Sequence, residues 1–126
     1  MIQGIGIDIV SVVRMEKNLS RHGKRFPEKI LSDSELGEYE SSNIPAHFLA
    51  KRFAAKEALV KALGTGFRDG IFLKHISVTH DPDGCPKLLF IGKLGEVIQS
   101  RMISSHLSLS DEKDYACAVV VLESGS

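Results

Sequence analysis

The chain has 126 residues, of which 43% are hydrophobic and 25% are charged. These values are typical of a globular domain, and the length suffices to bury a core without disulfide bonds. Sixteen basic and sixteen acidic residues balance one another, which disfavours a general nucleic-acid binder. We therefore expect one domain over residues 1–126.

Signals for a membrane or for secretion are missing from the sequence. No apolar run reaches the roughly 18 residues of a membrane span, and the first residues lack the basic and then apolar pattern of a secretion signal. The two cysteines, Cys85 and Cys117, are not spaced as metal ligands. We expect a cytoplasmic protein that does not bind a membrane.

Residues 2–10 alternate between a set of isoleucines and a second set made of Gly4, Gly6 and Asp8, which predicts a β-strand. Aspartate is rare in strands, and glycine often marks the close approach of another group. An unpaired carboxylate in such a place is costly, so we interpret Asp8 as functional. The alternative, that Asp8 caps the next helix, is weaker because Ser11 is better placed to do so.

Three short helical segments are predicted between residues 11 and 40. The first ends before Gly23, the second is a turn over residues 27–31, and the third begins at Ser32 with Glu35 completing a capping box. Residues 14–29 hold two acidic residues against six basic ones: Arg14, Lys17, Arg21, Lys24, Arg25 and Lys29. Such a patch attracts an acidic partner, although an ordinary solvated surface explains it equally well.

The stretch FLAKRFAAKEALVKALGTG, residues 48–66, predicts one long helix that stops at a glycine. Its apolar residues need cover on more than one side, so we expect this helix to be central. Four residues fall on one of its faces at helical spacing: Phe53, Glu57, Lys61 and Gly64. The simple alternative for Glu57 and Lys61 is an exposed ion pair of about 0.2–0.5 kcal/mol.

The second half of the chain predicts strands with one helix between them. The turn-forming sequence DPDGCP, residues 81–86, predicts a hairpin of the strands at 76–80 and 87–91. Residues 105–110 and 115–122 predict two more strands, the last of them in the interior of a sheet. The helix over residues 94–102 is expected to turn these side chains inward: Leu94, Val97, Ile98 and Met102. The order predicts an α+β fold, with a mostly antiparallel sheet packed on the long central helix.

Asp8 and Glu57 are the candidate functional carboxylates, on elements predicted to pack together. Two carboxylates with open positions suit Mg²⁺ completed by water and phosphate oxygens, but they also suit the acid and base of a glycosidase. The surrounding sequence is cationic and glycine-rich, which favours a polyphosphate ligand; its residues are Arg52, Lys61, Gly64, Thr65, Gly66 and His106. Taken alone, His106 is also consistent with an ordinary half-buried histidine.

Four segments together resemble the bacterial holo-[acyl-carrier-protein] synthases, the small class of 4′-phosphopantetheinyl transferases. They are GIDIV at 6–10, the helix at 48–66, DPDGCPKL at 81–88 and HLSLSDEKDYACAVVV at 106–121. The resemblance covers nearly the whole chain and implies the fold of that family. It implies transfer of 4′-phosphopantetheine from coenzyme A to a serine of apo-acyl carrier protein, releasing adenosine 3′,5′-bisphosphate, in support of fatty acid biosynthesis. It also implies a homotrimer with active sites at subunit interfaces.

The same resemblance implies a role for each matching residue. Asp8 and Glu57 match the Mg²⁺ ligands, and Glu57 and Lys61 are the catalytic pair, with Lys61 contacting phosphate. The implied coenzyme A site comprises Arg52, Lys61, Gly64, Thr65, Gly66 and His106. The carrier protein is expected to dock on the basic patch, with an apolar contact from Phe26: the expected residues are Arg14, Arg21, Arg25 and Phe26.

Two residues depart from the family pattern, and we assign a role to neither of them. The hairpin turn has Cys85 where the family often has lysine, and Asp111 stands where a histidine is common. The sequence does not distinguish a metal-bound water from a water held by Glu57 as the general base. Two other classes of function are also left open: a non-catalytic module that binds coenzyme A or an acidic carrier domain, and a different Mg²⁺-dependent phosphotransfer enzyme acting on a nucleotide.

Overall fold

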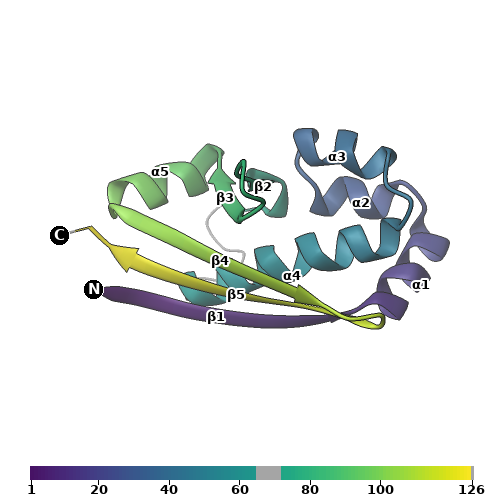
Figure 1. Cartoon of the computed structure of the whole chain (residues 1–126). Coiled ribbons are helices and arrows are strands. Elements are labelled where there is room, and N and C mark those ends of the chain that lie inside the picture. Colours follow the sequence, from purple (N-terminus) through teal and green to yellow (C-terminus); the bar gives the residue numbers. More distant parts are fainter. Residues whose placement is uncertain (65–71, 126) are drawn as a thin grey trace.

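The computed structural model describes residues 1–64 and 72–125 and consists of a curved antiparallel sheet laid along one long helix (Figure 1). The sheet has the order β1 (Ile2–Ser11), β5 (Tyr115–Ser124) and β4 (Ile103–Asp111), with β5 in the middle. Helix α4 (Pro45–Leu63) packs against β1 and β5. The predicted α+β fold with a central helix is therefore confirmed.

The smaller elements cover the rest of α4 (Figure 1). At one end lie α1 (Val12–His22), α2 (Arg25–Ile30) and α3 (Asp33–Glu40). Beside them lie the short 3₁₀ helix η1 (Leu73–His75), the hairpin of β2 (Ile76–His80) and β3 (Pro86–Phe90), and α5 (Gly92–Ser100). No helix of the described residues is long and apolar enough to cross a membrane.

The capping interactions agree with the helix ends predicted at Ser11, Ser32 and Gly64, whereas α4 starts one turn before the predicted residue 48. Ser11 accepts a hydrogen bond from the amide of Arg14, and Ser32 and Glu35 form the complete capping box. Helix α4 begins at Pro45 and ends where Gly64 adopts a φ of 76°, a left-handed conformation that suits glycine. Thr65 and Gly66, the rest of the predicted turn, lie outside the described residues.

Strand β1 lies so close to α4 that two of its residues have no room for a side chain. A Cβ atom on Gly4 would stand 2.0 Å from the Ala62 carbonyl oxygen, and one on Gly6 would stand 1.8 Å from that of Ala58. The group that approaches these glycines is thus the backbone of α4. Asp8 follows on the same face of the strand, which places its carboxylate against the helix.

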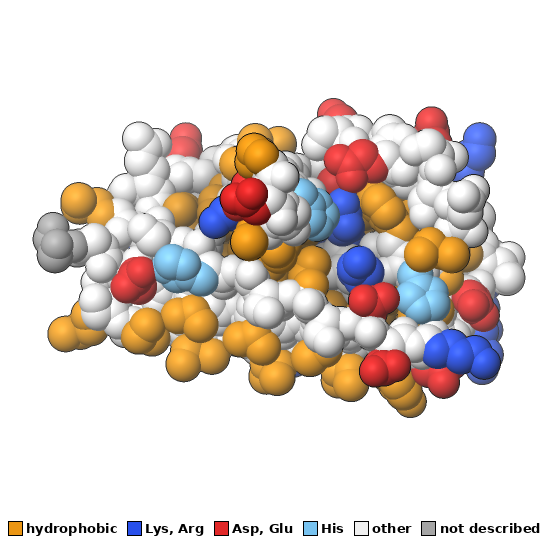
Figure 2. Space-filling model, viewed as in Figure 1, with side chains coloured by type: hydrophobic (Ala, Val, Ile, Leu, Met, Phe, Trp, Pro, Cys, Tyr) orange, Lys and Arg blue, Asp and Glu red, His pale blue; other side chains and the backbone are white. Residues whose placement is uncertain are grey.

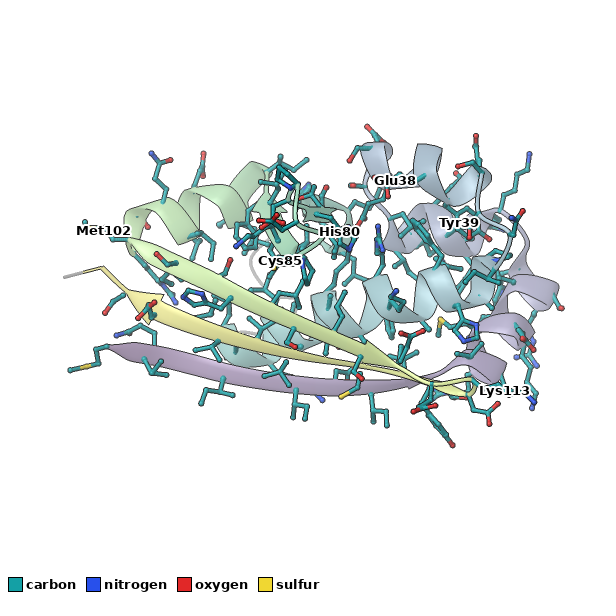
Figure 3. The ribbon with its side chains drawn as sticks, viewed as in Figure 1. Glu38, Tyr39, His80, Cys85, Met102 and Lys113 are labelled. Atoms are coloured by element: carbon teal, nitrogen blue, oxygen red, sulfur yellow. The ribbon has the colours of Figure 1, made fainter. Side chains whose placement is uncertain are left out.

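The second half of the chain follows the prediction with one correction. The β2–β3 hairpin is antiparallel, with Ile76 opposite Phe90, and β5 occupies the predicted interior position. The prediction that Met102 points inward is wrong: α5 ends at Ser100, and Met102 has a φ of 53° and is 67% exposed at the start of β4 (Figure 3). The chain leaves the helix there to enter the strand, so the helical spacing no longer applies.

Candidate functional site

Asp8 and Lys61 form an ion pair where β1 crosses α4. Lys61 Nζ lies 3.0 Å from Asp8 Oδ1 and donates a second hydrogen bond to the Ile7 carbonyl oxygen, also at 3.0 Å. The Asp8 side chain is 16% exposed and that of Lys61 is 55% exposed. The carboxylate is therefore held in place, while the ammonium group remains open to a ligand.

Glu57 faces the same place from one turn earlier in α4. Burial raises the pKa of Glu57, the negative charge of Asp8 raises it further, and Lys61 acts in the opposite direction. Both carboxylates line one pocket of about 240 Å³. Its other walls come from β1, α1 and α4: Ile9, Val10, Ser11, Arg14, Met15 and Phe53. The structure thus brings Asp8, Glu57 and Lys61 together, as the sequence predicts.

The pocket offers a suitable but incomplete set of ligands for a hard cation. No group of three or more His, Cys, Asp or Glu side chains in the described residues could hold a metal. Asp8 and Glu57 supply two carboxylates, and Mg²⁺ characteristically combines one or two carboxylates with waters and substrate phosphates. Such an ion would neutralise the negative charges of both Asp8 and Glu57, which repel each other in the pocket. The two residues therefore fit Mg²⁺.

His106 lies on the other face of the sheet. It stands opposite Val121 on β5, and Nε2 lies 2.8 Å from Glu123 Oε1. Strand β5 separates β4 from β1, and Asp8 points to the α4 side of the sheet. A single chain therefore does not bring His106 together with Asp8 and Glu57.

Arg52 points away from the pocket, on the opposite side of α4 from Lys61. Its side chain is buried, with one terminal nitrogen 3.0 Å from Glu38 Oε2 and Nε 3.5 Å from Glu35 Oε2. The guanidinium carbon also lies 4.2 Å from the centre of the Phe48 ring, a cation–π distance. Arg52 thus ties α4 to α3, and one chain does not bring it to the predicted site.

A buried ion pair next to Arg52 escaped the sequence analysis. Lys56 and Glu35 are almost completely buried and bond to each other. Lys56 Nζ also donates to the Ile30 carbonyl oxygen at 2.7 Å, and Glu35 accepts from the amide of Val78 at 2.8 Å. A helical charge pattern does not reveal such a pair, because lysine and glutamate are seldom buried. The only sequence signal was the capping box, which places Glu35 but not Lys56.

The predicted docking residues lie on α1 and α2. Arg14 lines the pocket of Asp8 and Glu57. On α2, Arg25 and Phe26 line a second pocket of about 450 Å³, with Lys29 and with Asn18 and His22 of α1. Arg21 is exposed on α1. The basic patch thus begins at the acidic pocket and continues along the helix.

Comparisons with known proteins agree with this geometry. The sequence model described as the 4′-phosphopantetheinyl transferase superfamily matches residues 4–120. A holo-[acyl-carrier-protein] synthase of Halorhodospira halophila is 52% identical over 126 residues, covering 99% of this chain and 100% of that protein. One of Nitrosospira multiformis is 51% identical over 124 residues, covering 98% and 99%.

Two solved structures show the same fold. The crystal structure of the holo-[acyl-carrier-protein] synthase from Neisseria meningitidis has a TM-score of 0.93 at 42% identity and covers 98% of this chain and 99% of that one. The synthase from Bacillus anthracis, solved in complex with coenzyme A, has a TM-score of 0.83 at 38% identity and covers 99% of each chain.

Proposed function

This chain belongs to the 4′-phosphopantetheinyl transferase superfamily, and from that premise we infer that it transfers the 4′-phosphopantetheine group of coenzyme A to a serine of apo-acyl carrier protein. The products are holo-acyl carrier protein and adenosine 3′,5′-bisphosphate, and the reaction supports fatty acid biosynthesis. The pocket in which Asp8 and Glu57 meet beside Lys61 carries this inference, together with the full-length match to the synthases.

In the proposed site, Asp8 and Glu57 hold Mg²⁺. The bound ion would offset the negative charge that develops on the leaving phosphate. Lys61 assists, because its ammonium group has three donors and the described contacts use two of them, to Ile7 and Asp8. The remaining donor is available to a phosphate oxygen beside the pocket.

Glu57 is our candidate for accepting the proton of the carrier serine, directly or through one water. A raised pKa brings a carboxylate closer to the basicity that proton transfer near neutral pH requires. Asp8 is held in position by its ion pair with Lys61. The two carboxylates can therefore divide the work, with Asp8 as a fixed ligand and Glu57 as ligand and base.

The pH dependence of the reaction tests this role of Glu57. Because its pKa is raised by burial and by Asp8, protonation should begin at a higher pH than for an ordinary glutamate. We expect kcat at saturating coenzyme A to fall on the acid side of a pH profile, and the acid limb to move to higher pH as the Mg²⁺ concentration is lowered, because the ion and the proton compete for Glu57. An acid limb that does not respond to the Mg²⁺ concentration would contradict the assignment.

We propose that the carrier protein docks along α1 and α2. The patch begins at Arg14 in the catalytic pocket and reaches Arg25 and Phe26 in the second pocket. A serine of the carrier that lies beside an acidic helix could therefore reach the catalytic pocket while the carboxylates of that helix contact the arginines. Such charges mainly affect association rate and salt dependence.

Charge reversal on the docking surface should affect one substrate only. We expect Arg21→Glu or Arg25→Glu to raise the KM for apo-carrier protein about tenfold, to leave the KM for coenzyme A unchanged, and to weaken the salt dependence of the reaction. Steady-state kinetics at several salt concentrations measure all three. Lys93→Glu, an equal charge change at an exposed position of α5, is the control. Equal effects on both substrates would show that the patch does not dock the carrier.

We further propose that the protein assembles as a homotrimer with shared active sites. The outer face of the sheet is apolar and uncovered along β1, where three isoleucines are 59–65% exposed: Ile5, Ile7 and Ile9. Figure 2 shows this line of hydrophobic side chains along the lower edge of the molecule. Exposed apolar patches of this kind mark interaction sites. Since His106 lies on the same outer face, a neighbouring copy can supply it to the site.

A complementation experiment tests the shared site. Asp8→Asn and His106→Ala chains should each be inactive or severely impaired alone. Mixed trimers formed by refolding the two together should regain activity, because some sites then combine an intact Asp8 with an intact His106. Light scattering should give a trimer for the wild type and smaller species for Ile7→Glu. No recovered activity, or a wild-type monomer, would contradict the arrangement.

Release of adenosine 3′,5′-bisphosphate from coenzyme A tests the reaction itself. Release should require apo-carrier protein and stop when its acceptor serine is replaced by alanine. A non-catalytic module would bind without release, and a phosphotransferase acting on another nucleotide would not need the carrier. The expected coenzyme A contacts of Arg52, Gly64, Thr65 and Gly66 stay predictions.

A further inference from the structure

His22 of α1 lines the second pocket, beside basic residues of the proposed docking surface. Arg25 and Lys29 of α2 line this pocket with it, and Asn18 and Phe26 complete the described lining. Arg14, Asn18 and His22 are spaced by four residues on α1, so they form one stripe that leads from the catalytic pocket to this one. His22 itself is exposed.

The charged residues that line the pocket with His22 are basic, and Glu28, the acidic residue of α2, lies outside the described lining. The neighbours of His22 on α1 and in the following turn are Arg21 and Lys24, and α2 contributes Arg25 and Lys29. Helix α4 packs against α1 and α2 but contributes no residue to the described lining of this pocket. No carboxylate of the described residues forms a salt bridge with His22, Arg25 or Lys29. The protonated form of His22 therefore has no described counter-charge within the chain.

From this arrangement we propose that docking of the acidic carrier protein is linked to protonation of His22. The inference rests on the docking surface described above. When carboxylates of the carrier enter the pocket, they favour the imidazolium form, so binding takes up a proton. Binding is then stronger at a pH where imidazole is protonated and weaker above it.

The physiological consequence follows from the range in which histidine titrates. Imidazole changes charge between about pH 5 and pH 8, whereas the arginines and lysines of the patch stay charged throughout. Arg14, Arg21 and Arg25 thus supply a constant attraction, and His22 supplies the part that varies. The KM for the carrier should therefore fall as the pH falls from about 8 toward about 6.

Four proteins separate this proposal from a general effect of pH: wild type, His22→Gln, His22→Arg and His80→Gln. The wild-type KM for apo-carrier protein should rise about two- to fivefold between about pH 6 and about pH 8. His22→Gln should be flat at the high value and His22→Arg flat at the low value. His80, an exposed histidine at the end of β2 that lines neither pocket, should give the wild-type curve when changed to glutamine.

Proton uptake provides a second and independent measurement. Calorimetric titration of the wild type with apo-carrier protein, in two buffers of different ionisation enthalpy, should show a fraction of a proton bound near pH 7 that is absent in both His22 variants. The proposal would be overturned if His22→Gln behaved like the wild type in both measurements, or if it changed the KM for the carrier by the same factor at every pH. If Arg25→Glu also leaves the carrier KM unchanged, the docking surface is wrong; if it raises that KM, only the proton linkage is wrong.

Discussion

Asp8→Asn and Glu57→Gln are each expected to lower kcat by about a thousandfold or more, a loss typical of removing one strong electrostatic contact to a transition state. Each change removes a charged oxygen from the pocket that both residues line and keeps the volume of the side chain. Inductively coupled plasma mass spectrometry of the dialysed proteins should show weaker retention of a Mn²⁺ probe in both variants, which gives a readout that does not depend on turnover.

The stability of the Glu57→Gln variant should not fall. Because the pKa of Glu57 is raised in the folded protein, the folded chain binds this proton more tightly than the unfolded chain. The free energy of unfolding therefore decreases as the pH rises through the interval between the two pKa values. At neutral pH the ionised carboxylate costs stability, and glutamine removes that cost.

Thermal unfolding and kinetics together decide the ligand assignment. Glu57→Gln should unfold at the same temperature as the wild type or a higher one, while Asp8→Asn loses only a surface ion pair of about 0.2–1 kcal/mol with Lys61. Glu96→Gln, at an exposed position of α5, is the matched control and should be fully active. Near-normal kcat in either site variant at saturating Mg²⁺ would show that these carboxylates are not the ligands.

Gly6→Ala is expected to destabilise the fold by about 3 kcal/mol, the upper part of the usual range for inserting a methyl group into a packed interior. The new Cβ atom would stand 1.8 Å from the Ala58 carbonyl oxygen, and this neighbour is a backbone atom that a rotamer change cannot move. Strand β1 must then separate from α4. Since β1 carries Asp8 and α4 carries Glu57, kcat should fall together with stability.

Urea unfolding of Gly6→Ala and of Gly37→Ala provides the comparison. Gly37 is an exposed residue of α3 with open space around the position of a Cβ atom, so its change to alanine should stabilise the protein by about 0.5–1 kcal/mol. Similar small effects at both glycines would show that β1 is not in backbone contact with α4. The approach of Asp8 to Glu57 would then need another explanation.

Local chemical rules explain which parts of the fold and site could be predicted from the sequence. Ser11, Ser32 and Gly64 were placed correctly because caps depend on neighbouring residues alone. The meeting of Asp8, Glu57 and Lys61 followed from the two glycines of β1 and from helical spacing in α4. Both signals describe a close approach between one strand and one helix.

The remaining features depend on contacts between distant segments. Lys56 looks like a surface lysine in the sequence, and only the arrival of α3 and β2 buries it against Glu35. Arg52 was assigned to coenzyme A by resemblance, yet the same tertiary contacts direct it to Glu38. His106 alternates with Leu107 and Leu109, which pack against the core, so it points to the outer face; that Asp8 lies on the inner face of the same sheet follows only from the register of β1 with β5.

The intact mass of an apo-acyl carrier protein, measured before and after incubation with this protein, coenzyme A and Mg²⁺, tests the central claim most directly. We predict a mass gain of one phosphopantetheinyl arm on the acceptor serine, which disappears with the serine-to-alanine carrier and with the Asp8→Asn enzyme. An unchanged carrier mass in the presence of the wild-type protein would contradict the proposed function.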